Sequence, residues 1–320
     1  MANIKQVAAR AGLSVACVSK YLKNPDSVLP SSRQQIEEAI RDLRYVPSRT
    51  ARSLRTKRSY TVKVILGSII NPFYAELFET LRLMLDTRGY AAVLHPLDRP
   101  LAPGDADGVD GILVGFANDE RQLASIAACA GGTPVVCLHW QALSSPLPCV
   151  WTDVRQGIRL AARHLLAAGC RRFAYIGGPE ADAISVRKLQ GVRAELEGAG
   201  LTLPGEWRHH GPFTFQSGYD ASKRLCRDGV WPDGILCEND VLAAGVICGL
   251  LRQGIRVPER IRVTGFDNIP LANMYTPAIT SVALPIDSLC REAVAMLFQL
   301  LAGQAADTRS FPPELIVRQS

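Results

Sequence analysis

The pattern of apolar positions at the start of the chain predicts two short helices. Asn3 is followed three positions later by Gln6, which is the pairing of a helix capping box. Gly12 is expected to adopt the left-handed backbone that ends a helix, and Ser14 is expected to cap the next one. We therefore predict two helices joined by a tight glycine turn. The apolar residues at helical spacing in the first helix are Ile4, Val7, Ala8 and Ala11.

The second helix has an inner face and an outer face. The inner face can pack on the first helix through Val18, Tyr21 and Leu22. The outer face suits a DNA major groove and carries Val15, Ala16, Ser19 and Lys20. A third helix is expected to start at Pro30 with a capping box of Ser31 and Gln34. Its apolar stripe closes a small core with Ile36, Ala39, Ile40 and Leu43.

From residue 61 onward, short apolar runs typical of buried strands alternate with longer helical patterns. Strands are expected at 62–66, 90–94, 109–114, 134–138, 172–176, 234–237 and 261–264. Helices are expected at 76–88, 154–168, 184–199 and 241–252. This alternation predicts an α/β fold with parallel sheets covered on both faces. Ligands of such folds bind beyond the carboxyl ends of the strands.

Composition excludes several classes of protein. No run of about 18 uncharged apolar residues is present, so a membrane span is not expected. The first residues enter a helical pattern directly and lack the apolar core of a secretory signal. The chain has 9 cysteines without any C-x-x-C pair, which fits neither a disulfide framework nor a zinc site. We expect a cytoplasmic protein that has no metal and no cofactor.

Positive charge is concentrated at the start of the chain. Residues 1–60 contain 12 Lys and Arg against 4 Asp and Glu, although the net charge of the whole chain is only +6. Five of these cations lie between residues 48 and 59, where the sequence carries almost no apolar surface. This distribution is typical of a small polyanion-binding module attached to a near-neutral body.

The segments IKQVAARAGLSVACVSKYLKNP and IEEAIRDLRYVPSRTARSLRTKRS resemble the headpiece and hinge of the lactose-repressor/galactose-repressor family. The resemblance continues through SIINPFYAEL, VDGILVG, CENDVLAAGV and RVTGFDNIPLANMYTPAITSV. It implies an all-α helix-turn-helix domain at 1–46, a hinge helix or linker at 47–60, and an effector-binding and dimerisation domain at 61–320. The last domain would have two interleaved α/β lobes, as in periplasmic sugar-binding proteins, joined by three crossing strands.

A homodimer of this family is expected to bind a palindromic DNA operator. Lys20 can donate to guanine, Val15 and Ala16 can contact thymine methyl groups, and serine hydroxyls can bond phosphates. The resemblance further implies that Leu54 enters the minor groove beside its counterpart from the second subunit. The expected DNA-binding residues are Ser14, Val15, Ala16, Ser19, Lys20, Tyr45, Arg52 and Leu54.

The chain departs from the family pattern in two regions. The recognition helix has Cys17 where threonine is usual and Lys20 where arginine is frequent, and lysine lacks the planar fork of arginine. Relatives carry a helix between the second and third strands, but residues 95–108 contain three prolines and two glycines. A helix is therefore not expected there, and the geometry of dimerisation is left open.

The resemblance also implies a set of residues that bind a small polar effector. Aromatic faces suit a sugar ring, carboxylates and amides bond hydroxyl groups, and a cation can hold an anionic group. A lysine at position 188 is similar to regulators of gluconate-type sugar acids, so both sugars and sugar acids are candidates. The expected residues are Phe73, Tyr74, Asp153, Arg187, Lys188, Phe213, Asn239 and Asp267. Some of these residues also have an alternative structural role. Asp153, Asp267 and Asn239 can cap the segments that follow them, and Phe213 can belong to the hydrophobic core.

Other functions have less support in the sequence. The glycine clusters match neither a dinucleotide fingerprint nor a phosphate loop, and the 5 histidines lack the spacing of metal ligands, so an enzyme is not expected. The pair His209 and His210 is interpreted as a solvated turn. A solute-binding protein of a transporter is an alternative, as is a regulator controlled by a protein partner.

Overall fold

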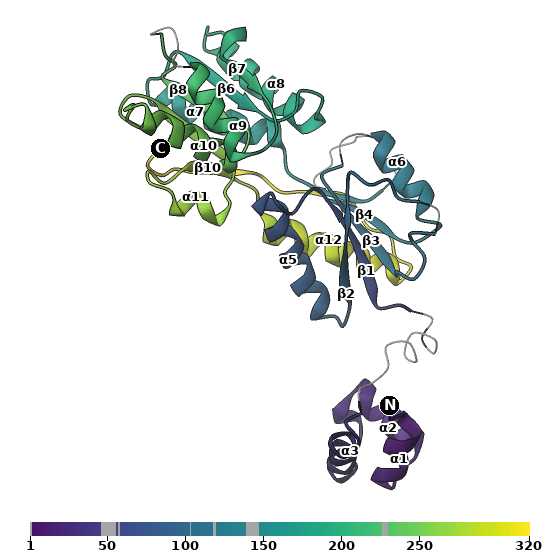
Figure 1. Cartoon of the computed structure of the whole chain (residues 1–320). Helices are drawn as coiled ribbons and strands as arrows, with labels where there is room; N and C mark the ends of the chain where they lie inside the picture. Colours follow the sequence, from purple (N-terminus) through teal and green to yellow (C-terminus); the bar gives the residue numbers. More distant parts are fainter. Residues whose placement is uncertain are drawn as a thin grey trace. The chain divides into compact units, whose positions relative to one another are not determined.

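The chain folds as two separate units, Met1–Tyr60 and Thr61–Ser320 (Figure 1). The computed structural model describes residues 2–45, 56, 58–102, 104–117, 120–138, 147–225 and 230–320. Within these ranges, no helix is long and apolar enough to cross a membrane.

The first unit is built from short helices whose ends match the sequence signals. Asn3 accepts hydrogen bonds from the main chain of Lys5 and Gln6, and the side chain of Gln6 completes the expected capping box. Gly12 ends the first helix with φ 66°, and Ser14 caps the second through the amide of Cys17 at 3.1 Å. The elements are α1 (Ile4–Ala11), α2 (Val15–Lys23), η1 (Pro25–Ser27) and α3 (Pro30–Leu43).

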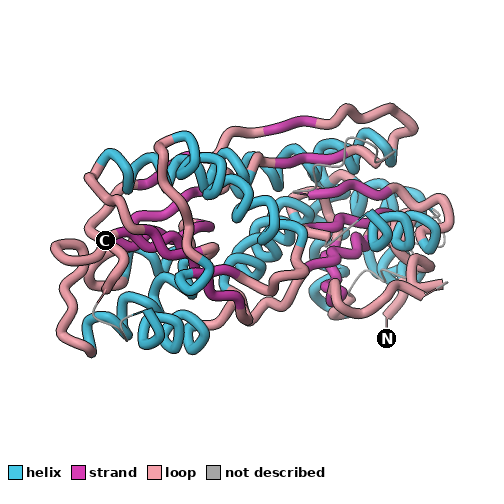
Figure 2. Tube along the Cα trace, turned by 90° about the horizontal axis from the view of Figure 1, so that it is seen from above, coloured by secondary structure: helices cyan, strands magenta, loops and turns pink. Residues whose placement is uncertain are grey.

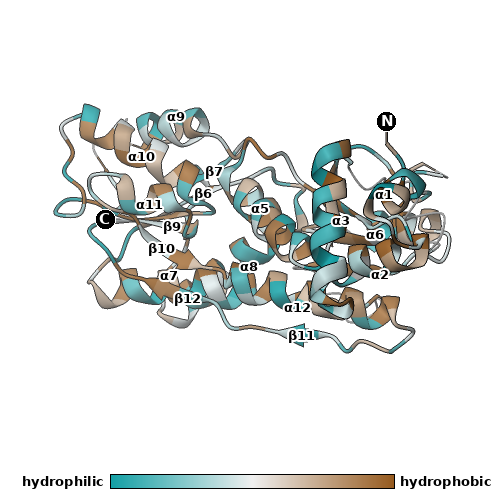
Figure 3. Ribbon diagram, turned by 90° about the horizontal axis from the view of Figure 1, so that it is seen from below, coloured by the Kyte–Doolittle hydropathy of each residue, from teal (hydrophilic) through white to brown (hydrophobic). Residues whose placement is uncertain are grey.

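The three α-helices enclose a small apolar core. Its fully buried members are Val7, Ala8, Ala11, Val18, Ile36 and Ala39, and Tyr21, Leu22, Ile40, Leu43 and Tyr45 pack around them. The opposite surface of α3 is polar, so this helix is mostly teal in Figure 3. The predicted capping box of Ser31 and Gln34 is wrong. Pro30 occupies the first helical position, which its fixed φ favours, so Leu29 becomes the N-cap and Ser31 lies inside the first turn.

In the second unit, one sheet, here called sheet A, is formed by the first five strands and a later one. Its order is β11-β5-β4-β3-β1-β2, and all of its pairings are parallel. The strands are β1 (Thr61–Leu66), β2 (Ala91–Pro96), β3 (Gly111–Gly115), β4 (Val135–Leu138), β5 (Cys149–Trp151) and β11 (Arg309–Ser310).

The two faces of sheet A are covered by different helices. On β3, Ile112 and Val114 pack in the core beneath α6 (Glu120–Cys129). The alternate residue Gly111 faces α12 (Ile286–Leu301), which packs beside α5 (Pro72–Asp86). Because neighbouring residues of a strand point to opposite faces, the apolar run of β3 is buried on both sides. Figure 1 shows α6 and α12 on opposite sides of the sheet.

The other sheet, sheet B, repeats this architecture. Its order is β12-β10-β9-β8-β6-β7, and only the β10–β12 pairing is antiparallel among the described strands. Helices α9 (Phe215–Leu225) and α10 (Asp240–Arg252) cover one face, and α7 (Val154–Ala167) and α8 (Ala183–Gly198) cover the other. The strands are β6 (Phe173–Gly177), β7 (Arg208–His210), β8 (Gly234–Cys237), β9 (Arg262–Asp267), β10 (Thr280–Ala283) and β12 (Glu314–Ile316). The short elements η2 (Gly205–Trp207) and α11 (Pro270–Met274) complete this lobe.

The chain passes between the lobes three times. The passages lie between β5 and α7, between β10 and α12, and between β11 and β12, because α12 and β11 return to sheet A. Figure 2 shows the strands of the two sheets as separate groups, with loop segments running between them. This is the expected architecture of two interleaved α/β lobes.

The described residues between β2 and β3 form turns and contain no helix, as the prolines and glycines predict. This connection nevertheless contributes to the core, because Leu97, Leu101 and Ala106 are buried against sheet A. In this connection between β2 and β3, three apolar side chains cover the part of sheet A that a connecting helix would otherwise cover.

Several predicted boundaries differ from the structure. Helix α5 starts at Pro72 rather than at residue 76, because Asn71 caps it and proline suits the first helical position. His209 and His210 belong to the half-buried strand β7, so their interpretation as a solvated turn is wrong. Pairing with β6 supplies the backbone hydrogen bonds that keep this short segment extended.

Candidate functional site

The outer face of α2 carries the residues predicted to meet DNA. Val15, Ala16 and Lys20 are exposed and Ser19 is partly exposed, whereas Val18 is completely buried. At 41% exposure, the Val15 side chain is accessible at the surface of this domain. Helix α2 therefore presents a surface of one cation, two small apolar side chains and hydroxyl groups.

The other predicted DNA-binding residues lie elsewhere. Ser14 is exposed at the start of α2, where its side chain is already used as the helix cap. Tyr45 is half-buried against the core of the headpiece. Arg52 and Leu54 lie outside the described residues, so their roles remain predictions.

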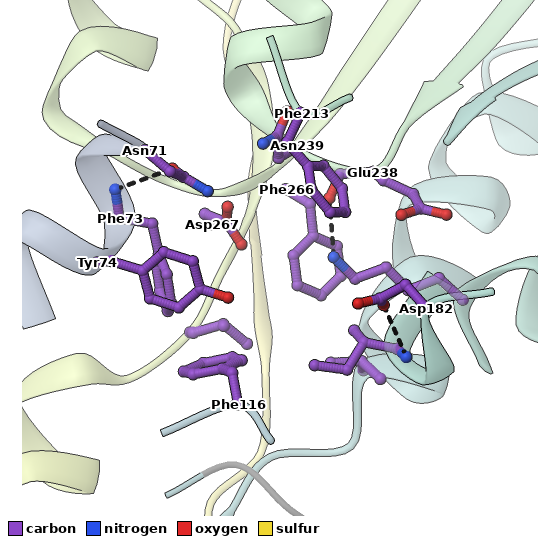
Figure 4. A pocket seen from close by; sticks show the side chains of 14 residues that line it. Asn71, Phe73, Tyr74, Phe116, Asp182, Phe213, Glu238, Asn239, Phe266 and Asp267 are labelled. Atoms are coloured by element: carbon purple, nitrogen blue, oxygen red, sulfur yellow. Dashed lines mark hydrogen bonds between the residues drawn. The ribbon is translucent and has the colours of Figure 1, made fainter. Parts of the chain in front are cut away.

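A cavity lies between the two lobes of the body (Figure 4). Both lobes contribute to it, and several of its residues follow the carboxyl ends of parallel strands, where ligands of α/β folds bind. The lobe of sheet A supplies Asn71, Phe73, Tyr74 and Phe116. The rest of the lining is Val154, Asp182, Ile184, Lys188, Phe213, Glu238, Asn239, Phe266, Asp267 and Leu284.

Aromatic rings form much of the cavity wall. Phe73 contacts Tyr74 and Phe116 edge to face, with ring centroids 5.5 Å and 5.0 Å away. Phe213 and Phe266 face them from the other lobe (Figure 4). Burial raises the pKa of the Tyr74 phenol, which therefore stays neutral. These rings offer flat apolar surfaces on both sides of a bound molecule.

The polar groups of the cavity come chiefly from the lobe of sheet B. Lys188 is 5% exposed; its Nζ donates to the main-chain oxygen of Glu238 at 2.8 Å and lies 3.7 Å from the centroid of Phe266. Asn239 caps α10 with its Oδ1, at 2.8 Å from the amide of Leu242. Its buried Nδ2 has no hydrogen-bond partner among the described residues. A ligand acceptor at this position would satisfy the amide.

Asp267 contributes a carboxyl group at the end of β9. Burial raises its pKa to about 6; the charge of Lys188 opposes the shift, and the charges of Glu238 and Glu76 add to it. Asp267 and Phe116 both have left-handed backbones, with φ 94° and 58°. Such conformations cost about 1 kcal/mol or more for residues other than glycine, and they concentrate at ligand sites.

Six of the eight predicted effector residues line this cavity: Phe73, Tyr74, Lys188, Phe213, Asn239 and Asp267. Asp153 and Arg187 are not part of the lining. Asp153 caps α7 through the amides of Arg155 and Gln156, at 2.9 Å and 3.1 Å. Phe213 has both predicted roles, because it lines the cavity and also packs on the core of sheet B.

Five further polar or aromatic residues line the cavity but were not predicted from the sequence: Asn71, Phe116, Asp182, Glu238 and Phe266. Asn71 and Asp182 each precede a helix, so cap signals mark their positions although not their access to the cavity. Phe116 and Glu238 directly follow apolar runs that end as parallel strands. No local signal distinguishes Phe266 from an ordinary core residue.

A metal centre has no candidate in the part of the chain that the structure describes, since no three His, Cys, Asp or Glu side chains gather there. The cavity instead offers hydrogen-bonding groups and aromatic faces.

A helix-turn-helix headpiece joined to a two-lobed body with a cavity between the lobes defines a ligand-responsive DNA-binding regulator. Residues 3–48 match the bacterial regulatory proteins of the lacI family, and residues 162–320 match the periplasmic binding protein-like domain. The HTH-type transcriptional repressor PurR of Proteus mirabilis is 31% identical over 330 residues, covering 100% of this chain and 97% of that protein. The chain belongs to the lacI family, and it is a DNA-binding transcription regulator.

Other relatives share the same organisation. The ribose operon repressor of Escherichia coli is 31% identical over 304 residues, covering 93% of this chain and 92% of that protein. The transcriptional regulator CelR, solved as a cellobiose complex, is 29% identical with a TM-score of 0.73 and full coverage of both chains. The Lac repressor dimer, solved with its operator and the anti-inducer ONPF, has a TM-score of 0.86 at 23% identity and covers 99% of this chain and 98% of that chain. This last similarity concerns the fold.

Proposed function

We propose that this regulator is a homodimeric repressor that binds a palindromic operator and responds to an uncharged, polyhydroxylated metabolite held between its lobes. The observation that carries the effector proposal is the cavity, whose polar edge includes Asn239 and Asp267 and whose walls are aromatic. Sugar rings have an apolar face for aromatic contact and hydroxyl groups that donate to carboxylates and accept from amides.

Operator recognition rests on α2. Lys20 is the exposed cation on its outer face, beside the exposed Val15 and Ala16. A lysine can donate to the O6 and N7 atoms of guanine, and small apolar side chains can contact thymine methyl groups. Ser14, Ser19 and Tyr45 are proposed to contact phosphates, and Arg52 and Leu54 to act in the linker.

The proposed homodimer follows from the symmetry of a palindromic operator. A single helix-turn-helix reads one half-site, and two-fold symmetric dimers of such modules bind two half-sites about one helical turn apart. The Lac repressor was solved as a dimer on its operator. We expect this protein to use the same assembly and to show no enzymatic turnover of its effector.

The charge of the cavity favours a sugar over a sugar acid. Asp182 and Asp267 are carboxylates in the lining, Glu238 adds a third, and Lys188 is the one cation that the described lining contains. An effector with its own carboxylate would meet this net negative environment after losing its hydration. A sugar acid paired with Lys188 is the competing hypothesis, and control by a protein partner is a second one.

The proposal is tested by selecting bound sequences from a random duplex pool with the purified full-length protein. The selection is repeated with a mixture of neutral sugars and with a mixture of sugar acids. We expect a palindromic site that is enriched without effector and lost with the neutral sugars. A non-palindromic site would contradict the homodimer, and loss only with sugar acids would contradict the uncharged effector.

A further inference from the structure

Glu238 is a completely buried acidic residue directly behind the effector cavity. Its carboxylate accepts hydrogen bonds from the Ser185 hydroxyl at 2.6 Å, the Gly178 amide at 3.0 Å and the Tyr175 hydroxyl. Figure 4 shows this carboxylate turned away from the centre of the cavity. Glu238 is therefore held by the protein itself and has little capacity left for a ligand hydrogen bond.

Three neighbouring groups each donate a hydrogen bond to this carboxylate, and hydrogen bonds to a charged acceptor are stronger than those to a neutral one. The ionised side chain also disfavours a second negative charge on the nearby Tyr175, since burial and Glu238 both raise the pKa of that phenol. The network thus keeps one negative charge fixed in the interior.

The charge of Glu238 acts inside the cavity. It is one of the causes that raise the pKa of the cavity carboxyl of Asp267. Lys188 Nζ donates a hydrogen bond to the main-chain oxygen of the same residue at 2.8 Å. An anionic ligand would be attracted by the ammonium group of Lys188, and the negative charge of Glu238 weakens this attraction.

We propose that Glu238 determines the charge selectivity of the effector cavity, so that uncharged polyols bind and their carboxylate counterparts are rejected. This inference rests on the proposed sugar-type effector. Glu238 acts through electrostatic repulsion rather than contact, because its oxygens are occupied by Tyr175, Ser185 and Gly178. Rejection by a fixed like charge is an effective source of specificity in a site that excludes water.

The test uses isothermal titration of the full-length protein with matched pairs of ligands: glucose and glucuronate, galactose and galacturonate. We expect the wild type to bind the neutral member of at least one pair about tenfold or more tightly than the acid. Glu238→Gln keeps the size of the side chain and removes its charge, so the ratio within that pair is expected to fall by about tenfold. Glu238→Met is the second variant if the amide perturbs folding.

Two control variants separate charge from structure. Glu197→Gln removes an equal charge from an exposed position near the end of helix α8, and Tyr175→Phe removes a hydrogen bond to the carboxylate but leaves the charge. Both are expected to preserve the ratio. An unchanged ratio in Glu238→Gln, or an equal fall in Tyr175→Phe, would overturn the proposal.

A second measurement is independent of any effector. Carboxyl-carbon NMR of the unliganded protein follows the pKa of Asp267, which is expected to fall in Glu238→Gln because one cause of its elevation is removed. An unchanged pKa would overturn the role of Glu238 whatever the effector is. If no sugar binds but the pKa falls, the sugar-type effector fails while the electrostatic role of Glu238 holds.

Discussion

Adding one methyl group at Gly178 is expected to impair the effector response without affecting the headpiece. A β-carbon built on this residue would lie within 2.7 Å of three carbons of the Phe213 ring. Carbon atoms in contact are separated by about 3.5 Å, so in Gly178→Ala the ring must retreat by about 1 Å or more. Phe213 lines the cavity, and any retreat from residue 178 changes its shape.

The expected cost follows from this displacement. Overpacking of a filled site costs about 1–3 kcal/mol, and if this cost falls on the bound state, effector affinity decreases by about fivefold to about 150-fold. The ring is the outer part of a side chain that is only partly buried, so global stability should fall by less than the binding energy does. The headpiece forms a separate unit, and operator binding without effector should change by less than about twofold.

The assay combines calorimetry with the selected effector and fluorescence anisotropy with the selected operator. Gly198→Ala is the matched control, because a β-carbon there meets no atom within 4 Å. We expect the control to retain both affinities. Unchanged effector affinity in Gly178→Ala, or parallel loss of operator binding, would refute the assignment of Phe213 to the wall of the effector site.

Three further predictions concern DNA recognition and pH. Lys20→Ala is expected to relax base preference at one position of each half-site by roughly 1–3 kcal/mol, measured by competition with operator variants; a uniform loss across all sequences would make Lys20 a phosphate contact. Leu54→Ala, outside the described residues, is expected to weaken specific binding far more than non-specific binding, and equal losses on both DNAs would contradict a minor-groove wedge. Because the pKa of Asp267 is raised to about 6, its ionisation destabilises the folded protein above that pH, and the penalty disappears as the pH falls toward the ordinary value of the carboxyl. Thermal unfolding of Asp267→Asn at pH 4 to 7 should therefore show increasing relative stability as the pH rises, and a parallel pH profile would contradict the shift.

The headpiece could be predicted in detail because its determinants are local. The cap formed by Asn3 and Gln6, the left-handed Gly12 and the cap of Ser14 each act within a few residues. Periodicity then assigned the buried and exposed faces of α2. The error at the third helix arose where two local signals overlapped, since Pro30 favours a start two residues before the one that a Ser31 cap requires.

The cavity could be predicted only in part. Six of its residues were carried over from the family resemblance, but Glu238 and Phe266 look like ordinary continuations of buried strands. Asn239 illustrates why local reasoning is insufficient. Its cap role is readable in the sequence, yet the same side chain also places an unpaired Nδ2 in the cavity. Asp153 has an equally clear cap role and lies outside the lining.

Local sequence patterns were sufficient to predict the α/β alternation of the body, the faces of the headpiece helices and the concentration of positive charge, because these depend on neighbouring residues and on composition. Helices α6, α9 and α12 were not predicted. Only the tertiary structure decided which strand ends meet between the lobes. It also decided that Ser185, Tyr175 and Gly178 surround the Glu238 carboxylate, although they precede it by more than fifty residues. The physical reason is that long-range packing of the two sheets and their crossing segments sets these distances, and with them the burial and charge on which ligand selectivity depends.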